Sequence, residues 1–416
     1  MANLQTPRGT RDILPDQQAL WNFVKATGTR VASSLGFAPI TTPTYEYREL
    51  FERAIGEGTD VMDKELFLLR SRGTEAGKEE YALRPEGTAG IVRSYIENGM
   101  HTWPQPVKLT SFINCFRYDR PQKGRYREHV QFDLELFGEK GPFSDALIIL
   151  ATYRFLTELG LSGLKLQLNS LGVLEERNTY QSALVAALKD KKSELSEDSQ
   201  KRLETNPLRI LDSKDAKDQA LLGSIPALAT FFSPETSAHF AKVQEYLTAW
   251  QIPFELNARL VRGLDYYSHT AFEWTTEGAG GQQSSLGGGG RYDGLITQLG
   301  GKDCGAVGAG IGLDRVVEEL ERQGITPPAE TSTETVAVIV ASPSAAVKAA
   351  GLVSKFLWEG KQVVANFDRE NVGAQFKQAD RAGAVTAYIL GDEELANGTV
   401  TVKNLANGEQ HTEPLT

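Results

Sequence analysis

Cysteine and histidine are scarce in this chain of 416 residues. The two cysteines, Cys115 and Cys304, are too few for a disulfide framework and suit a reducing compartment. The five histidines are scattered, with no H-x-x-x-H spacing and no C-x-x-C pair, so the usual sequence signatures of a zinc site are missing. We therefore expect a cytoplasmic protein without a metal site of its own.

Long apolar runs are missing as well. No stretch approaches the roughly 20 residues that a membrane helix needs, and the opening MANLQTPRGTRDILP has no apolar signal core, so we expect no membrane partner. The net charge of −10 excludes a chain coated in nucleic-acid-binding surface, although it leaves room for a local basic patch. The chain is long for one core, and we expect two or three domains.

Changes in composition and in hydrophobic pattern along the chain suggest where those domains lie. Residues 1–172 mix helical and strand patterns, residues 173–255 are amphipathic, charged and almost free of strand patterns, and strand character returns over 256–324. Residues 325–335 read as a polar linker rich in Pro and Thr. Residues 336–416 then follow a β-α-β-α-β pattern that ends in an extra strand, which predicts a small α/β domain.

A local basic patch does exist. The segment FRYDRPQKGRYREH carries Arg117 and Arg125 among five cations, with a turn predicted at Pro121 and Gly124 between two apolar-aromatic strands. A solvated loop is the alternative interpretation. A hairpin with a basic tip would suit phosphate.

Carboxylates follow the same hairpin. In QFDLELFG, Gln131, Asp133 and Glu135 alternate onto one strand face, and LRPEGTAG places Glu86 and Thr88 on a tight turn before a helix. Buried carboxylates need partners, and a ligand ammonium or an arginine would serve. These residues therefore indicate a pocket for a cationic group.

Two further stretches combine aromatic and charged residues. RGLDYYSHTAFEW begins with Arg262 and the pair Tyr266–Tyr267; a half-solvated strand would also explain its alternation. SLGGGGRYDGL places four glycines before Tyr292, either as a flexible loop or as backbone that a ligand approaches closely. A fixed cation, phenol hydroxyls and accessible backbone together suit a small anionic or zwitterionic ligand.

The segment GAGIGLDRVVEEL has glycines that lead into a helix with Arg315 in its first turn, where exposed amides favour an anion. The spacing is G-x-G-x-G rather than the G-x-G-x-x-G of a dinucleotide fingerprint, and no βαβ unit surrounds it. Close packing of strand against helix is the competing explanation for the glycines, and both can hold if Arg315 meets phosphate.

Taken together, these motifs resemble those of histidyl-tRNA synthetases, which are class II aminoacyl-tRNA synthetases, nearly from end to end. PRGTRDILP is similar to the family's N-terminal signature and ELFERAIGEGTDVMDKELF to its dimer-interface segment. FRYDRPQKGRYREHVQFDLELFG resembles class motif 2 and GAGIGLDRVVEEL motif 3, while RGLDYY and GGRYDGL resemble the two histidine-specific motifs.

The resemblance implies roles for individual residues. Arg117 would contact the α-phosphate of ATP, Arg315 the γ-phosphate and Arg125 the nucleotide as well, whereas Arg262 would be the catalytic arginine on the substrate carboxylate and α-phosphate. The residues implied to bind histidine, apart from Arg262, are Glu86, Thr88 and Gln131 at the α-ammonium, Glu135 and Tyr267 beside the imidazole, and Tyr266 and Tyr292 in the pocket wall. The sequence departs from the family at His129–Val130, and we expect this to affect only packing behind the site.

The implied fold is α+β: an antiparallel catalytic sheet with a helical insertion, followed by an α/β anticodon-binding domain. The implied activity is histidine–tRNA ligation, with ATP and Mg²⁺, L-histidine and tRNA(His) as partners and a homodimer as the assembly. A synthetase-like regulatory subunit of ATP phosphoribosyltransferase is the alternative. Such paralogs lack the anticodon domain and have degraded histidine-specific motifs, whereas this sequence retains both.

Overall fold

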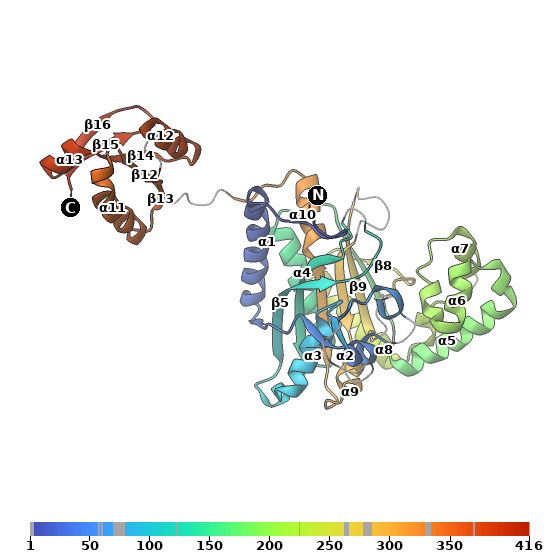
Figure 1. Ribbon diagram of the computed structural model, residues 1–416. Coiled ribbons are helices and arrows are strands. Elements are labelled where there is room, and N and C mark those ends of the chain that lie inside the picture. Colours follow the sequence, from blue (N-terminus) through green and yellow to red (C-terminus); the bar gives the residue numbers. More distant parts are fainter. Residues whose placement is uncertain are drawn as a thin grey trace. The chain divides into compact units, whose positions relative to one another are not determined.

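The computed structural model describes residues 4–56, 59, 61–69, 80–121, 124–223, 225–261, 266–277, 285–328, 334–368 and 371–415. The chain forms two compact units, Met1–Pro327 and Pro328–Thr416 (Figure 1). Each unit has its own sheet and its own buried core, and each is described by itself.

An eight-stranded sheet is the framework of the first unit. Its strands lie in the order β1-β5-β6-β11-β10-β9-β7-β8, and only the outermost pairs, β1 with β5 and β7 with β8, are parallel. In chain order the strands are β1 (Ala38–Pro39), β5 (Val107–Phe116), β6 (Glu128–Phe137), β7 (Leu164–Ser170), β8 (Glu255–Leu256), β9 (Ser268–Thr276), β10 (Ser285–Arg291) and β11 (Ala306–Gly312). The antiparallel catalytic sheet expected from the resemblance is therefore confirmed.

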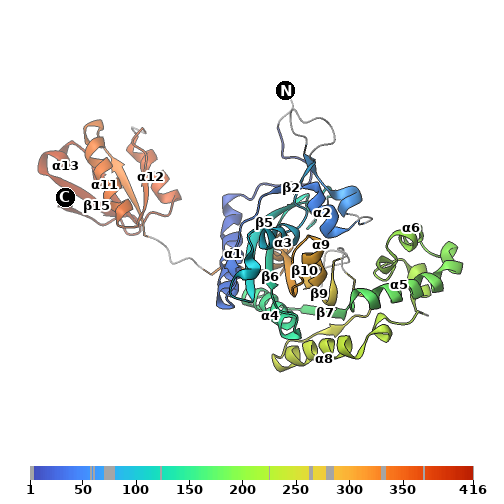
Figure 2. The same ribbon diagram turned by 90° about the horizontal axis from the view of Figure 1, so that it is seen from below.

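Alternation along the strands separates two cores, one on each face of this sheet. Phe132, Leu134 and Leu136 of β6 point to one core, while Phe137, with the polar residues of the same parity, faces the other. Four helices pack on the first face: α1 (Pro15–Ser34), α4 (Pro142–Glu158), α8 (Pro234–Ala249) and α10 (Leu313–Arg322). Figure 2 shows α4 and α8 along one side of the sheet and α2, α3 and α9 along the other.

The second face carries the shorter elements of this unit. They are α2 (Arg48–Ile55), α3 (Thr88–Glu97), α9 (Asp293–Gln298), a π-helical turn at Val61–Glu65 and a small sheet in the order β2 (Tyr45–Tyr47), β4 (Tyr81–Leu83) and β3 (Leu68–Leu69). The helical insertion adds α5 (Leu174–Leu188), α6 (Glu197–Thr205) and α7 (Ala216–Leu222), and its apolar residues join the core on this face. The helix that follows them, α8, instead packs against α4.

The second unit is a five-stranded sheet with helices on both faces. The strands lie in the order β13 (Gln362–Ala365), β12 (Thr335–Val340), β14 (Thr386–Leu390), β15 (Thr399–Asn404) and β16 (Gln410–Pro414). The first three are parallel, and β12 is apolar on both faces because α11 (Ala346–Trp358) covers one face and α12 (Val372–Arg381) the other.

The repeating pattern predicted for the C-terminal unit is present, but the prediction of a single extra strand was incomplete. The structure adds a short helix, α13 (Asp392–Asn397), and β16 pairs antiparallel with β15 as a second added strand. The segment of β16 is exposed along its whole length, so its sequence lacks the apolar alternation that marks a strand. In the part of the chain that the structure describes, no helix has the length and apolar character needed to cross a bilayer.

Candidate active site

Glu135 lies at the centre of a buried polar cluster on the second face of the sheet. Its side chain is fully buried, and its two oxygens accept hydrogen bonds from different elements. Thr88 Oγ1 at the start of α3 donates to Oε1 over 2.6 Å, and the Tyr292 hydroxyl donates to Oε2. Burial, and then the nearby Asp133, raise the pKa of Glu135 well above its usual value.

A second pair of carboxylates borders this cluster. The oxygens of Glu86 accept from the backbone N–H groups of Thr88 at 2.7 Å and Ala89 at 2.8 Å, which satisfies the exposed amides at the start of α3. Asp133 accepts a 2.6 Å hydrogen bond from Nε2 of Gln131. Burial raises the pKa of Glu86 and raises that of Asp133 to about 7, so this pocket disfavours negative charge until a cation enters.

The glycines of GAGIG make room for these side chains. Strand β11 pairs with β6 so that Gly308 lies opposite Glu135, Gly310 opposite Asp133 and Gly312 opposite Gln131. A Cβ at Gly308 would lie 1.6 Å from Oε2 of Glu135, and one at Gly310 would lie 2.0 Å from Nε2 of Gln131. These two glycines are thus required by the polar cluster itself, which is a different reason from the strand–helix packing considered for them from the sequence.

Three tyrosines from two segments meet beside the cluster. The ring centroids of Tyr266 and Tyr267 are 4.7 Å apart, and the ring centroid of Tyr292 is 5.6 Å from that of Tyr266 and 6.5 Å from that of Tyr267. All three side chains are buried. Of the residues expected to bind histidine, Gln131 and Tyr267 line a cavity, and Glu86, Thr88, Glu135, Tyr266 and Tyr292 lie in the buried cluster next to it.

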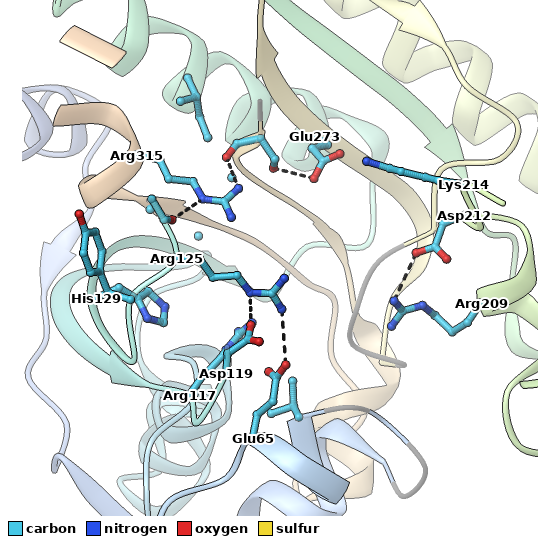
Figure 3. Close-up of a pocket in the computed structure, with 18 of the residues that line it drawn as sticks. Glu65, Arg117, Asp119, Arg125, His129, Arg209, Asp212, Lys214, Glu273 and Arg315 are labelled. Atoms are coloured by element: carbon cyan, nitrogen blue, oxygen red, sulfur yellow. Dashed lines mark hydrogen bonds and ion pairs between the residues drawn. The ribbon is translucent and has the colours of Figure 1, made fainter. Parts of the chain in front are cut away.

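The three arginines expected to bind ATP line a cavity of about 750 Å³ beside this cluster. Nε of Arg117 donates to the Pro85 carbonyl over 2.8 Å, Arg125 pairs with Asp119 and Glu65, and Nε of Arg315 donates to the Gly124 carbonyl over 3.0 Å. In Figure 3, Arg125 and Arg315 project toward a common space from the hairpin tip and from α10. Burial and then the charge of Arg125 lower the pKa of Arg315, and the nearby Glu273 and Glu318 oppose this effect only in part.

His129 also lines this cavity. Its ring lies near Arg117 and Arg315, and burial together with these two cations lowers its pKa to about 3, so the imidazole is neutral. The departure at His129–Val130 therefore affects the cavity wall itself, and the expectation that it affects only packing behind the site was wrong. Strand alternation could have predicted that His129 lines the cavity, because His129 lies on the same face of β6 as Gln131 and Glu135.

The helical insertion forms the opposite wall of the cavity, and none of its residues was expected at the site. Arg209, Asp212 and Lys214 face the cavity from the segment between α6 and α7 (Figure 3). Their signal in the sequence is the charged stretch RILDSKD between two amphipathic helices. Arg262 lies outside the described residues, so its predicted position has no structural counterpart here.

Comparison with known proteins gives a consistent result over the whole chain. The sequence model for histidyl-tRNA synthetase matches residues 9–316, and that for an anticodon binding domain matches residues 335–416. The chain belongs to the histidyl-tRNA synthetase family. It is 43% identical over 411 residues to a histidine–tRNA ligase of Dehalococcoides mccartyi, a match that covers 99% of this chain and 97% of that protein. A histidine–tRNA ligase of Listeria innocua is 40% identical over 410 residues, which cover 98% and 95% of the two chains.

Solved structures of the family share this fold. The apo histidyl-tRNA synthetase of S. aureus superposes with a TM-score of 0.81 at 32% identity and covers 99% of this chain and 98% of its own. A Bacillus halodurans protein titled as an ATP phosphoribosyltransferase regulatory subunit/histidyl-tRNA synthetase has a TM-score of 0.64 at 22% identity and covers 93% and 97%; at that identity the likeness concerns the fold alone. Membership of the histidyl-tRNA synthetase family makes this chain an aminoacyl-tRNA ligase that uses ATP.

Proposed function

We propose that this chain activates L-histidine with ATP to give histidyl-adenylate and diphosphate, and then transfers the histidyl group to the 3′ end of tRNA(His), releasing AMP. The observation that carries the proposal is the position of Glu135, a buried carboxylate that Thr88 and Tyr292 hold in an acidic cluster. Gln131, which donates to Asp133 of this cluster, lines one end of the cavity, and arginines line the other end. An amino acid with a polar ring fits the first end and a polyphosphate the second.

The first step requires no nucleophile from the protein. A carboxylate oxygen of histidine attacks the α-phosphorus of ATP, a new O–P bond forms, and the bond to the diphosphate breaks. Arg117 would contact the α-phosphate and Arg315 the γ-phosphate, and Arg262 is proposed as the cation between the carboxylate and the α-phosphate. A ribose hydroxyl of the tRNA then attacks the carbonyl and AMP departs. Orientation and stabilisation of developing charge account for the catalysis.

Mg²⁺ is the metal that this reaction needs, because it neutralises charge on the polyphosphate. Mg²⁺ usually keeps several waters and is bound by substrate phosphates together with one or two carboxylates. Glu273 lies on the cavity wall close enough to influence the pKa of Arg315, and it is the carboxylate that would hold such an ion. Metal binding would therefore depend on ATP.

A homodimer is proposed from an exposed apolar surface on the small sheet. Tyr45, Tyr47 and Leu68 are each more than half exposed, and Leu69 lies beside them on β3. Large apolar side chains gathered in this way mark a surface for another protein, and the segment that resembles the family's dimer interface covers most of α2 and ends at Phe67, directly before β3. Sedimentation of the purified protein, compared with a Leu68→Glu variant, tests this assignment.

The C-terminal unit is proposed to read the anticodon of tRNA(His). It has its own sheet and its own core, so its removal should leave the catalytic unit folded. Deleting the residues after 324 should preserve histidine-dependent ATP–pyrophosphate exchange while charging of tRNA collapses. Normal charging by the shortened protein would refute the assignment.

The central experiment is ATP–pyrophosphate exchange measured with each of the twenty amino acids. We expect exchange with histidine alone, followed by charging of tRNA(His). The regulatory-subunit alternative predicts binding of histidine without charging. The two functions are thus separated by one further measurement on the same preparation.

A further inference from the structure

Arg291 ends β10 directly before Tyr292 and is completely buried. It pairs with Val307, a residue of the core on the first face, so its side chain lies on the opposite face of the sheet from Glu135. All five of its N–H donors have acceptors: Nε and one terminal nitrogen meet Oδ1 of Asp145, and the remaining donors reach Asp293 and the carbonyls of Glu139 and Gly141. A buried guanidinium is costly unless it is fully paired, and breaking such a pair is strongly destabilising. This arrangement fixes the end of β10 to the start of α4.

The second oxygen of Asp145 extends the network to β9. Oδ2 accepts a hydrogen bond of 2.5 Å from the Thr270 hydroxyl and one of 2.8 Å from Nε2 of His239 on α8. Burial alone would raise the pKa of Asp145, but Arg291 and His239 outweigh it and lower the pKa below its usual value. The Thr270 hydroxyl is therefore held by a charged, fully coordinated carboxylate.

Thr270 lies in a bulge of β9 that begins two residues after Tyr267. Gly290 of β10 pairs with Ala271, whereas Arg291 pairs with Ser268, so His269 and Thr270 have no opposite residues on that side. His269 has a φ of 46°, which a side chain other than glycine adopts only when its surroundings enforce it. A bulge of this kind re-aims the side chains beside it.

The bulge and the network together determine where the pocket tyrosines lie. Tyr267 precedes the bulge on one strand, and Tyr292 directly follows Arg291 on the other. A Cβ at Gly290 would lie 2.2 Å from the Thr270 carbonyl oxygen and 3.0 Å from Cδ1 of Tyr267, so the two strands are in close contact at this point. A shift of the bulge would therefore move the Tyr267 ring.

We propose that Thr270, Asp145 and Arg291 are positioning residues for the amino-acid pocket: from the opposite face of the sheet they fix the β9 bulge, and so the placement of Tyr267 and Tyr292. This proposal rests on the proposed function, in which those tyrosines border the substrate imidazole. It assigns no contact with substrate to the three residues. Their loss should therefore weaken the use of histidine and leave the use of ATP nearly intact.

A second contact between α4 and β9 offers a matched control. Thr152 on α4 is also buried, and its hydroxyl accepts a 2.8 Å hydrogen bond from Nε1 of Trp274, farther along β9. Thr270→Val and Thr152→Val each replace a buried hydroxyl by a methyl group and each remove a link between α4 and β9. Only the first touches the bulge, so a purely structural role predicts the same outcome for both variants.

The test is histidine-dependent pyrophosphate exchange at varied histidine and at varied ATP, with melting temperatures for each protein. We expect Thr270→Val to raise the KM for histidine roughly tenfold while the KM for ATP stays within about twofold, since small displacements of binding groups have effects of this size or larger. Thr152→Val should lower the melting temperature without changing either KM. Thr270→Ser, which keeps the hydroxyl, should restore the KM for histidine.

Equal histidine KM values for the two valine variants would overturn the positioning role. So would equal increases in the KM for histidine and the KM for ATP in Thr270→Val. If Thr270→Val does not fold, Thr270→Cys, with a weak donor of similar size, is judged by the same criterion. Absence of histidine-dependent exchange in the unaltered protein would instead refute the proposed function. The two failures are thus distinguishable.

Discussion

The acidic cluster at one end of the cavity and the arginines at its other end have opposite electrostatic environments. At the acidic end Asp133 and Glu135 are completely buried, and their pKa values are raised. At the basic end the side chain of Arg125 keeps 37% of its surface exposed and is paired with Asp119 and Glu65. The two carboxylates thus have no contact with solvent, whereas Arg125 keeps part of its surface in solvent.

The difference indicates how each end selects its ligand. Buried carboxylates that disfavour charge are stabilised when a cation arrives, and a ligand that cannot supply the matching donors leaves polar groups unpaired, which is strongly discriminating. The partly exposed Arg125 already has carboxylate partners, so a polyphosphate that binds it gains only the difference between two ion pairs. We therefore expect specificity at the acidic end and rate at the basic end.

Replacement of Arg117 should produce the largest effect, and it acts at the basic end. Arg117→Met removes the guanidinium that Pro85 orients, and with it the charge proposed to meet the α-phosphate. We expect adenylate formation to slow by roughly 10²–10³, as for removal of a transition-state donor, with a much smaller change in the KM for histidine. Single-turnover formation of adenylate measures this directly.

Arg120→Met is the control for that prediction. Arg120 belongs to the same basic run but is exposed and does not line the cavity. Its replacement should change the rate less than about twofold, as surface charges usually do. A comparable loss in both variants would mean that overall charge, and not position, sets the rate.

The next largest effect is expected at the acidic end from a single methyl group. Gly308→Ala places a Cβ 1.6 Å from Oε2 of Glu135, so the carboxylate has to move. We expect kcat/KM for histidine to fall roughly a hundredfold, because the proposed imidazole partner loses its position, while ATP binding persists. Gly312→Ala should cost far less, since its nearest neighbour, the Leu286 carbonyl oxygen, is 3.6 Å away. Similar losses in the two variants would contradict the assignment of Gly308.

A charge-only change at the same end should have a more moderate effect. Glu135→Gln keeps the shape of the side chain but can direct an N–H at a substrate donor. We expect kcat/KM for histidine to fall about tenfold to a hundredfold, from one buried polar group left without its match. Asp133→Asn shares the strand face and should cost less. The opposite order would show that Asp133 is the imidazole partner.

The smallest predicted effect is a release of protons when histidine binds. Because burial raises the pKa of Asp133 to about 7, the stability it contributes to the free protein is fully present below its unfolded pKa near 4 and is lost as pH rises through about 7. A bound ammonium favours the ionised form, so histidine binding at pH 6 should release a fraction of a proton and weaken as pH falls.

Titration calorimetry at pH 6 in two buffers with different ionisation enthalpies measures that release. The substrate imidazole titrates in the same range, and Asp133→Asn with the same ligand provides the subtraction. We expect the variant to release fewer protons than the unaltered protein. Equal release from both would place the titrating group elsewhere in the cluster.

Much of this molecule is readable from local patterns. Period-two alternation placed Gln131, Asp133 and Glu135 on one face, and the turn residues between β5 and β6 predicted a hairpin with a basic tip; the structure confirms both. The α/β repeat after residue 335 was equally visible because α11, α12 and the strands between them have strong apolar periods. The exposed β16, which has no such period, was missed.

The cavity itself could not be read in this way. Alternation assigns a residue to a face, but the pairing of β11 with β6, more than 160 residues apart in the chain, decides that Gly308 lies opposite Glu135. The insertion brings Arg209, Asp212 and Lys214 to the same cavity from a segment whose sequence shows only charge and amphipathic helices. The glycines before Tyr292 were interpreted as a flexible loop or as backbone that a ligand approaches, yet the same motif GGRYDGL contains Arg291, whose partners lie in α4, in the turn before α4 and at Asp293.

The sequence by itself thus determined the chemistry available to this protein: which side chains exist, on which strand face each one lies, and where helices and turns begin. Local sterics and hydrophobic periodicity are enough for that. Only the tertiary structure decided which of these groups meet, which carboxylates are dry enough to hold a proton, and which arginine supports the pocket from behind. Those properties depend on the burial and proximity of segments distant in sequence, and no local pattern encodes them.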